Sequence, residues 1–150
     1  VVTKLSFNKI ETYRQVSQEI LSVLEVESHF VTRMATVSCL LHQAFPCFYW
    51  TGFYMVDPYT NDQLVVGPYQ GTLGCLRIPF GKGVCGAAAS KEETKIVGDV
   101  NTKSEIVVPV WDSTNELIAV LDIDSKEPGY FDQTDREALE HILSHVFSEG

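Results

Sequence analysis

The stretch Cys75-Leu-Arg-Ile-Pro-Phe-Gly-Lys-Gly-Val-Cys85-Gly86 decides between two classes of fold. Its glycines match the pattern G-x-G-x-x-G, which in dinucleotide-binding proteins opens the helix of a parallel βαβ unit. Here Cys75 to Phe80 is predicted to be a strand, but Gly86-Ala-Ala-Ala-Ser90 leaves room for a helix of only about two turns before Lys95. The neighbouring strands also look antiparallel, so we predict no dinucleotide site and a fold of the α+β class.

The rest of the chain supports this class through its periodicity. Apolar residues recur at helical spacing in three segments, and Asn8 and Asp132 are the predicted N-caps of the first and the last. The predicted helices are Asn8 to Glu25, His29 to Phe45 and Phe131 to Phe147. The predicted strands are Phe48 to Val56, Gln63 to Val66, Cys75 to Phe80, Lys95 to Val97, Ser104 to Trp111 and Leu117 to Asp124. We therefore expect a central, mostly antiparallel sheet of about six strands with helices packed on it.

Aromatic side chains are concentrated in the first predicted strand. Successive side chains of a strand point to opposite faces of the sheet. One face is then predicted to carry Phe48, Trp50, Gly52 and Tyr54, and the other Tyr49, Thr51, Phe53 and Met55. Trp50 and Tyr54 either pack in the core, as most strand aromatics do, or form the wall of a pocket for an apolar or cationic ligand.

Two carboxyl groups share one face of the last predicted strand. In Val120-Leu-Asp-Ile-Asp124, alternation separates Asp122 and Asp124 from the apolar residues on the other face. Glu105 opens the preceding strand and could lie beside them. Three acidic groups in one place could hold an ammonium group or a divalent cation, or could raise one another's pKa so that one stays protonated. The alternative is a strand end that reaches water, and the spacing leaves both open.

Cys75 and Cys85 flank the glycine turn and are the candidate redox residues. A cysteine at the start of a helix lies near unpaired N–H groups and the positive end of the helix dipole. Both effects lower the pKa of the thiol and favour a reactive thiolate, so the stretch is either a redox site or only a well-packed turn. Cys39 and Cys47 are instead predicted to be small buried hydrophobic residues. Four cysteines in a chain that can fold without cross-links do not indicate a disulfide framework.

Length and charge exclude several classes of function. A chain of 150 residues can bury its own core, so we expect residues 1–150 to form a single domain. The net charge of −9 argues against a nucleic-acid-binding surface, which needs clustered Lys and Arg. No apolar run is long enough for a membrane span, and no signal peptide is recognisable. We therefore expect a cytoplasmic protein, with neither a cofactor nor a resident metal ion.

A series of short motifs resembles the free methionine-(R)-sulfoxide reductase family, whose members are single GAF domains. The motifs are Trp50-Thr-Gly-Phe-Tyr54, Gly67-Pro-Tyr-Gln-Gly71, the stretch Cys75 to Gly86, Ser104-Glu-Ile-Val-Val-Pro109 and Val120-Leu-Asp-Ile-Asp-Ser125. The resemblance runs over most of the chain and in the family's order. It implies a GAF-like fold and the reduction of free L-methionine-(R)-sulfoxide by cysteine sulfenic acid and disulfide chemistry, with thioredoxin restoring the thiols.

The family uses three cysteines, of which two match Cys75, the candidate resolving thiol, and Cys85. The third, generally assigned as the nucleophile, lies in a loop with the pattern Pro-Gly-His-Ile-Ala-Cys-Asp. That loop belongs between Asn101 and Thr102, and the pattern is not there. Either the chain has lost the segment or the printed sequence omits it, and the match on both sides favours the second. A true deletion would put the usual route of reduction in doubt.

The resemblance also implies how the substrate is held. Glu105, Asp122 and Asp124 would bind its ammonium group, and one of them, kept protonated, would donate to the sulfoxide oxygen. Trp50 and Tyr54 would pack on the methyl and thioether part. Two other functions use the same fold without turnover, namely a GAF domain that senses a small ligand and a plain interaction module. A homodimer is a further expectation.

Overall fold

The computed structural model describes residues 8–98 and 103–149 and confirms the α+β class. The helices are α2 (Lys9–Val23), α3 (Phe30–Ala44), α4 (Gly83–Lys91) and α5 (Gln133–Leu143), which continues as the π-helical turn η1 (Ser144–Ser148). The strands are β1 (Phe48–Val56), β2 (Gln63–Gly71), β3 (Arg77–Pro79), β4 (Lys95–Gly98), β5 (Ser104–Trp111) and β6 (Leu117–Ser125). Both predicted N-caps are confirmed, since the Asn8 and Asp132 side chains accept hydrogen bonds from backbone N–H groups of α2 and α5.

Three predicted boundaries were wrong. Strand β2 extends to Gly71 because it pairs with β1 as far as the Trp50–Gly71 register pair. Strand β3 begins only at Arg77, because Cys75 and Leu76 belong to the loop that precedes it. The final helix changes to π-helical geometry after Leu143.

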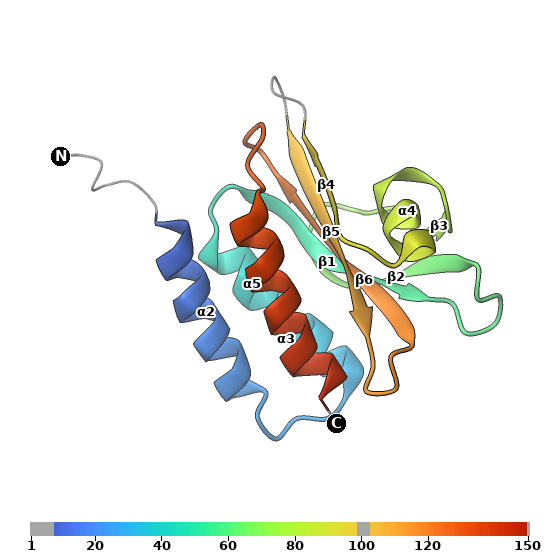
Figure 1. The fold of residues 1–150 in the computed structure, drawn as a ribbon, viewed down its shortest axis with the longest axis horizontal. Helices are drawn as coiled ribbons and strands as arrows, with labels where there is room; N and C mark the ends of the chain where they lie inside the picture. The colour runs from blue at the N-terminus through green and yellow to red at the C-terminus, as the bar shows by residue number, and fades with distance from the viewer. Residues whose placement is uncertain (1–7, 99–102, 150) are drawn as a thin grey trace.

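The six strands form one sheet in the order β3-β2-β1-β6-β5-β4, and every neighbouring pair is antiparallel. Helices α2, α3 and α5 lie on one face of the sheet, whereas α4 lies on the other (Figure 1). Strand β6 is central, between β1 and β5. In residues 8–98 and 103–149, no helix is both long and apolar enough to cross a membrane.

The side chains of β1 depart from simple alternation at its start. Trp50 and Tyr54 lie on the α4 face, and Phe53 lies in the helix-side core, as predicted. Phe48, however, is also in the helix-side core, and Tyr49 packs on the α4 face. The register of the β1–β6 pair shifts between Phe48 and Trp50, and such a bulge moves the preceding side chains to the opposite face.

The glycine turn brings α4 close to β3. The N–H of Gly81 donates to the carbonyl oxygen of Gly86 at 2.8 Å, and the N–H of Lys82 donates to that of Pro79 at 3.1 Å. A Cβ atom on Gly86 would lie 2.5 Å from the Pro79 oxygen, so only glycine allows this approach. The turn therefore fixes where the first residues of α4, including Cys85, meet the sheet.

A buried carboxylate joins the two ends of the chain. Asp135 on α5 is fully buried and accepts hydrogen bonds from the Tyr13 hydroxyl at 2.6 Å and the Lys9 ammonium at 2.7 Å, both on α2. The backbone N–H of Asp132 also donates to Asp135, at 2.9 Å. These charge-assisted bonds satisfy the carboxylate and hold α2 against α5.

We predict that Asp135→Asn lowers the free energy of unfolding by about 3 kcal/mol, because it removes the closer ion-pair partner of the largely buried Lys9 ammonium and leaves only the more distant Asp132. Urea unfolding followed by circular dichroism measures the loss. Glu137→Gln, at an exposed position of the same helix, is the control and should change stability by less than about 0.5 kcal/mol. Equal effects of the two substitutions would contradict the buried ion pair.

Candidate functional site

A cavity of about 500 Å³ opens on the α4 face of the sheet. Its lining includes all seven residues that the sequence analysis selected, namely Trp50, Tyr54, Cys75, Cys85, Glu105, Asp122 and Asp124. They come from β1, β5, β6, the start of α4 and the loop before β3. Residues that are far apart in the sequence thus meet in one site, while their individual roles stay predictions.

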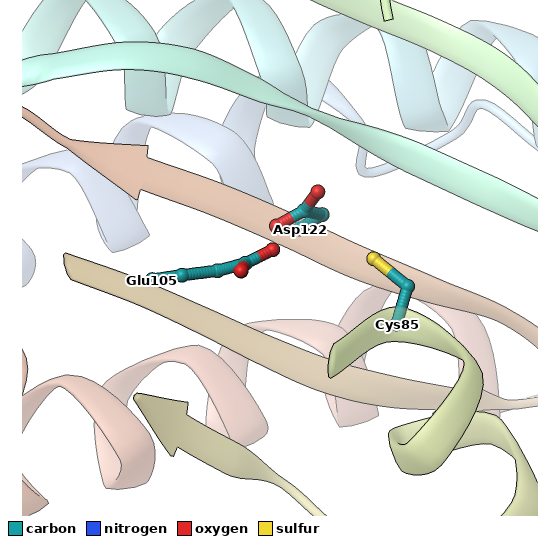
Figure 2. A group of neighbouring side chains, drawn as sticks. All are labelled: Cys85, Glu105 and Asp122. Carbon is teal, nitrogen blue, oxygen red and sulfur yellow. The ribbon is translucent and has the colours of Figure 1, made fainter. Parts of the chain in front are cut away.

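The floor of the cavity is acidic. Register pairs Glu105 on β5 with Asp124 on β6, and Asp122 lies two residues further along β6, beneath the start of α4. One oxygen of Glu105, one oxygen of Asp122 and the sulfur of Cys85 all lie within 4.8 Å of one another. Figure 2 shows the three side chains pointing toward a common point between β5, β6 and α4.

Burial decides the protonation of these acids. Asp122 is only 6% exposed, and burial, a hydrogen bond with Glu105 and the Glu105 charge raise its pKa well above the ordinary value. Burial and the same neighbour raise the pKa of Asp124 to about 7, although the Lys103 ammonium acts in the opposite direction. At neutral pH the set therefore keeps at least one carboxyl proton.

The two thiols have different surroundings. Cys75 is exposed, whereas Cys85 is 5% exposed. The expectation that the start of the helix lowers the Cys85 pKa was wrong. Burial raises this pKa, and so do the nearby carboxylates of Asp122 and Glu105. Desolvation and negative neighbours here outweigh the helix dipole, whose effect is modest and limited to the first turn.

Trp50 and Tyr54 line the cavity as part of an aromatic stack. The Trp50 ring lies 5.6 Å from that of Tyr54 and 4.9 Å from that of Tyr69, with the planes nearly parallel. The Trp50 indole N–H donates to the carbonyl oxygen of Thr72 at 2.9 Å, so the stack also holds the loop that carries Cys75. A Cβ atom on Gly74 in this loop would lie 2.8 Å from the Trp50 ring, which leaves no space for a side chain there.

The sequence analysis missed two groups of the lining. Tyr49 reaches the cavity because of the bulge in β1, which alternation could not reveal, and the Lys103 ammonium lies 4.8 Å above its ring. Lys82 also lines the cavity, between Gly81 and Gly83 of the turn. The glycine motif contains this lysine, and its position between two glycines was the sequence signal that it lies in the turn at the cavity. Both glycines have positive φ in the structure.

The position of the family's third cysteine falls on residues 99–102, which lie outside the described residues. Gly98 of β4 pairs with Ser104 of β5, and the printed sequence has five residues, 99 to 103, between them. The chain has four cysteines, at positions 39, 47, 75 and 85, and none in this connection. The expectation that the printed sequence omits a segment stays an expectation, and the thiols that line the cavity are Cys75 and Cys85.

Comparison with known proteins identifies the family. The GAF domain model matches residues 8–147. The free methionine-R-sulfoxide reductase of Escherichia coli is 33% identical over 93% of this chain and 88% of its own length. That of Saccharomyces cerevisiae is 36% identical over 94% of this chain and 87% of its own. This chain belongs to the free methionine-R-sulfoxide reductase family of GAF domains.

A solved structure of the same family has the same fold. The free methionine-R-sulfoxide reductase of Neisseria meningitidis, in complex with its substrate, is 40% identical, with a TM-score of 0.87 over 94% of this chain and 89% of its own. The predicted family and the predicted GAF-like fold are confirmed, and the predicted enzyme class, an oxidoreductase, agrees with them.

We predict that Asp124→Asn removes part of a pH-dependent loss of stability. A carboxyl whose pKa is raised by folding holds more protons in the folded than in the unfolded state, so the free energy of unfolding falls as pH rises from about 4 to about 7. The variant should match the parent protein at pH 4 and exceed its stability at pH 8 by about 1–2 kcal/mol. Urea unfolding at both pH values measures this.

Among the described residues, the charged and titratable groups that interact with Asp124 include Glu105, Asp122, Lys103, Tyr49, Tyr54 and Cys85. Since Lys103 attracts the charged form, Lys103→Met serves as the matched control and should steepen the loss of stability. An Asn variant that is destabilised equally at both pH values would contradict the raised pKa of Asp124.

Proposed function

We propose that the protein reduces free L-methionine-(R)-sulfoxide to methionine in the cavity on the α4 face. The observation that carries the proposal is that one cavity is lined by three aromatic residues, three carboxyl groups and two thiols. A relative at 40% identity has been solved in complex with its substrate as a free methionine-R-sulfoxide reductase, which supports the same assignment.

The carboxyl groups and the aromatic rings would bind different parts of the substrate. Glu105, Asp122 and Asp124 would bind the ammonium group, because buried negative charge is stabilised by a cation that it can hydrogen-bond. Trp50 and Tyr54 would pack on the methyl and thioether part. Selectivity for the free amino acid follows, because a peptide bond replaces the charged amine by a neutral group and would leave the carboxylates unpaired.

The reaction would use both thiols of the cavity. The Cys75 thiolate attacks the sulfoxide sulfur while a protonated carboxyl donates to the departing oxygen, which gives methionine and a sulfenic acid on Cys75. The Cys85 thiol then condenses with the sulfenic acid, forming a disulfide and releasing water. A dithiol reductant, proposed to be thioredoxin, returns two electrons and two protons by thiol–disulfide exchange.

This order gives Cys75 the attacking role, although the family resemblance makes it the resolving thiol. Two observations support the change. Cys75 is exposed, whereas Cys85 is buried beside carboxylates that raise its pKa. The connection between β4 and β5 also lacks the third cysteine. Homodimer formation and a cytoplasmic location stay predictions.

A second function follows from the same two observations. A cavity with no third thiol and a mostly protonated Cys85 would bind the amino acid without reducing it, as a ligand-sensing GAF domain does. Turnover separates the two functions, because a sensor binds methionine sulfoxide and releases it unchanged. An interaction module would neither bind nor reduce it.

We predict that the protein converts the R but not the S epimer of free methionine sulfoxide when dithiothreitol, or thioredoxin with its reductase and NADPH, is supplied. Chromatography of the methionine formed measures the rate. Cys75→Ser should abolish turnover. With no external dithiol present, Cys85→Ser should form about one methionine per chain and leave a sulfenic acid on Cys75, which dimedone traps and mass spectrometry locates.

The matched control is Cys39→Ser, since Cys39 lies on α3 outside the cavity, and it should keep the parent rate. If Cys75→Ser instead gave the single turnover and the trapped sulfenic acid, the roles of the two thiols would be reversed. If the protein bound the R epimer but formed no methionine with either reductant, it would be a ligand sensor and not a reductase.

We also predict that Asp124→Asn raises KM for the free R epimer, or lowers kcat, by about tenfold or more, because it removes a charge-assisted contact of the ammonium group. Steady-state kinetics with the free epimer measure both constants. Glu137→Gln on α5 removes a carboxylate far from the cavity and should leave both unchanged. Parent kinetics in the Asp124 variant would remove the carboxylates from the mechanism.

A further inference from the structure

We propose that Cys85, Glu105 and Asp122 form a binding site for a divalent metal ion of the zinc type. One ligand atom from each residue lies within 4.8 Å of the other two, on three different elements of the fold. Their side chains converge on one point (Figure 2). Nothing in the reduction of a sulfoxide requires a metal, so this site is additional to the proposed reaction.

The cluster contains an unsatisfied buried atom, which independently indicates a ligand. Oδ1 of Asp122 is inaccessible to solvent and has no hydrogen-bond partner within residues 8–98 and 103–149. Asp122 as a whole is 6% exposed, in the middle of the sheet. A buried carboxylate oxygen without a partner is costly, and a bound cation supplies the missing interaction.

The spacing fits a small tetrahedral ion after a modest movement. Around Zn²⁺, ligand atoms at the usual bond lengths lie about 3.3–3.5 Å apart, so separations of up to 4.8 Å must shorten by at most about 1.5 Å. Glu105 has the longest of the three side chains and is only half-buried, so rotation about its side-chain bonds can supply most of this movement. The fourth position would face the cavity, where water completes the coordination.

The kinds of ligand atom determine which metal ions the site would prefer. One thiolate with two carboxylates suits Zn²⁺ or Cd²⁺, whereas Mg²⁺ and Ca²⁺ prefer oxygen donors alone. Binding replaces the protons of the Cys85 thiol and of the Asp122 carboxyl, and the ion then offsets the negative charge of the ligands. Bound metal would thereby occupy the carboxylates assigned to the substrate ammonium and exclude it, a consequence that rests on the proposed function.

Cadmium titration of the reduced, chelator-treated protein tests the site without any turnover. We expect one Cd²⁺ per chain, with an ultraviolet thiolate-to-metal absorption band, and displacement of the Cd²⁺ by Zn²⁺. Cys85→Ser should remove the band. Asp122→Asn and Glu105→Gln should each weaken binding at least about tenfold. Cys75→Ser and Cys39→Ser should leave both the band and the affinity unchanged.

Each other outcome overturns the site. Absence of the band in the parent protein would mean that no metal binds, and a band that survives in Cys85→Ser but is lost in Cys75→Ser or Cys47→Ser would place the metal elsewhere. Circular dichroism shows whether Cys85→Ser is folded, and Glu105→Gln provides a second test at a half-buried position. Because the titration contains no sulfoxide, its failure is independent of whether the protein is a reductase.

Discussion

The burial of Asp122 is the constraint on which the site depends. This carboxyl lies in the central strand β6, with β1 on one side and β5 on the other, and it has almost no access to water. Removing an ionised carboxylate from water costs several kcal/mol unless a cation or a set of donors replaces the water. Asp122 must therefore keep its proton or acquire a positive partner, and either state makes the cavity a place for a cation or for acid catalysis.

One face of β6 contributes to stability, and the other face forms the cavity. Leu121 and Ile123 lie fully buried in the core beneath the helices, while Asp122 and Asp124 face the cavity on the other side. The helix layer, held by the Asp135 network, supplies the apolar burial that stabilises the domain. The opposite face can then keep buried acids and a hollow, which are unfavourable for stability but useful for binding.

The sequence predicted the regular parts of this arrangement and not the irregular ones. Period-two alternation located the two acids of β6 correctly, because that strand is regular on both sides of them. It misplaced Phe48 and Tyr49, because a bulge depends on how two strands pair and leaves no mark in one strand's own pattern. The pKa of Cys85 was predicted in the wrong direction for a similar reason, since the carboxylates that raise it come from strands distant in the chain.

On the proposed function, the positive charge of the substrate's ammonium group would connect the acidic floor of the cavity with the state of Cys85. Burial and the neighbouring carboxylates keep Cys85 protonated, and a thiol without thiolate character is a poor target for oxidants. An ammonium group bound beside Glu105 and Asp122 would offset those charges and lower the Cys85 pKa. Cys85 would then become able to resolve a sulfenic acid only after a substrate has arrived. A chain with two thiols in its cavity could in this way confine thiol chemistry to the occupied site.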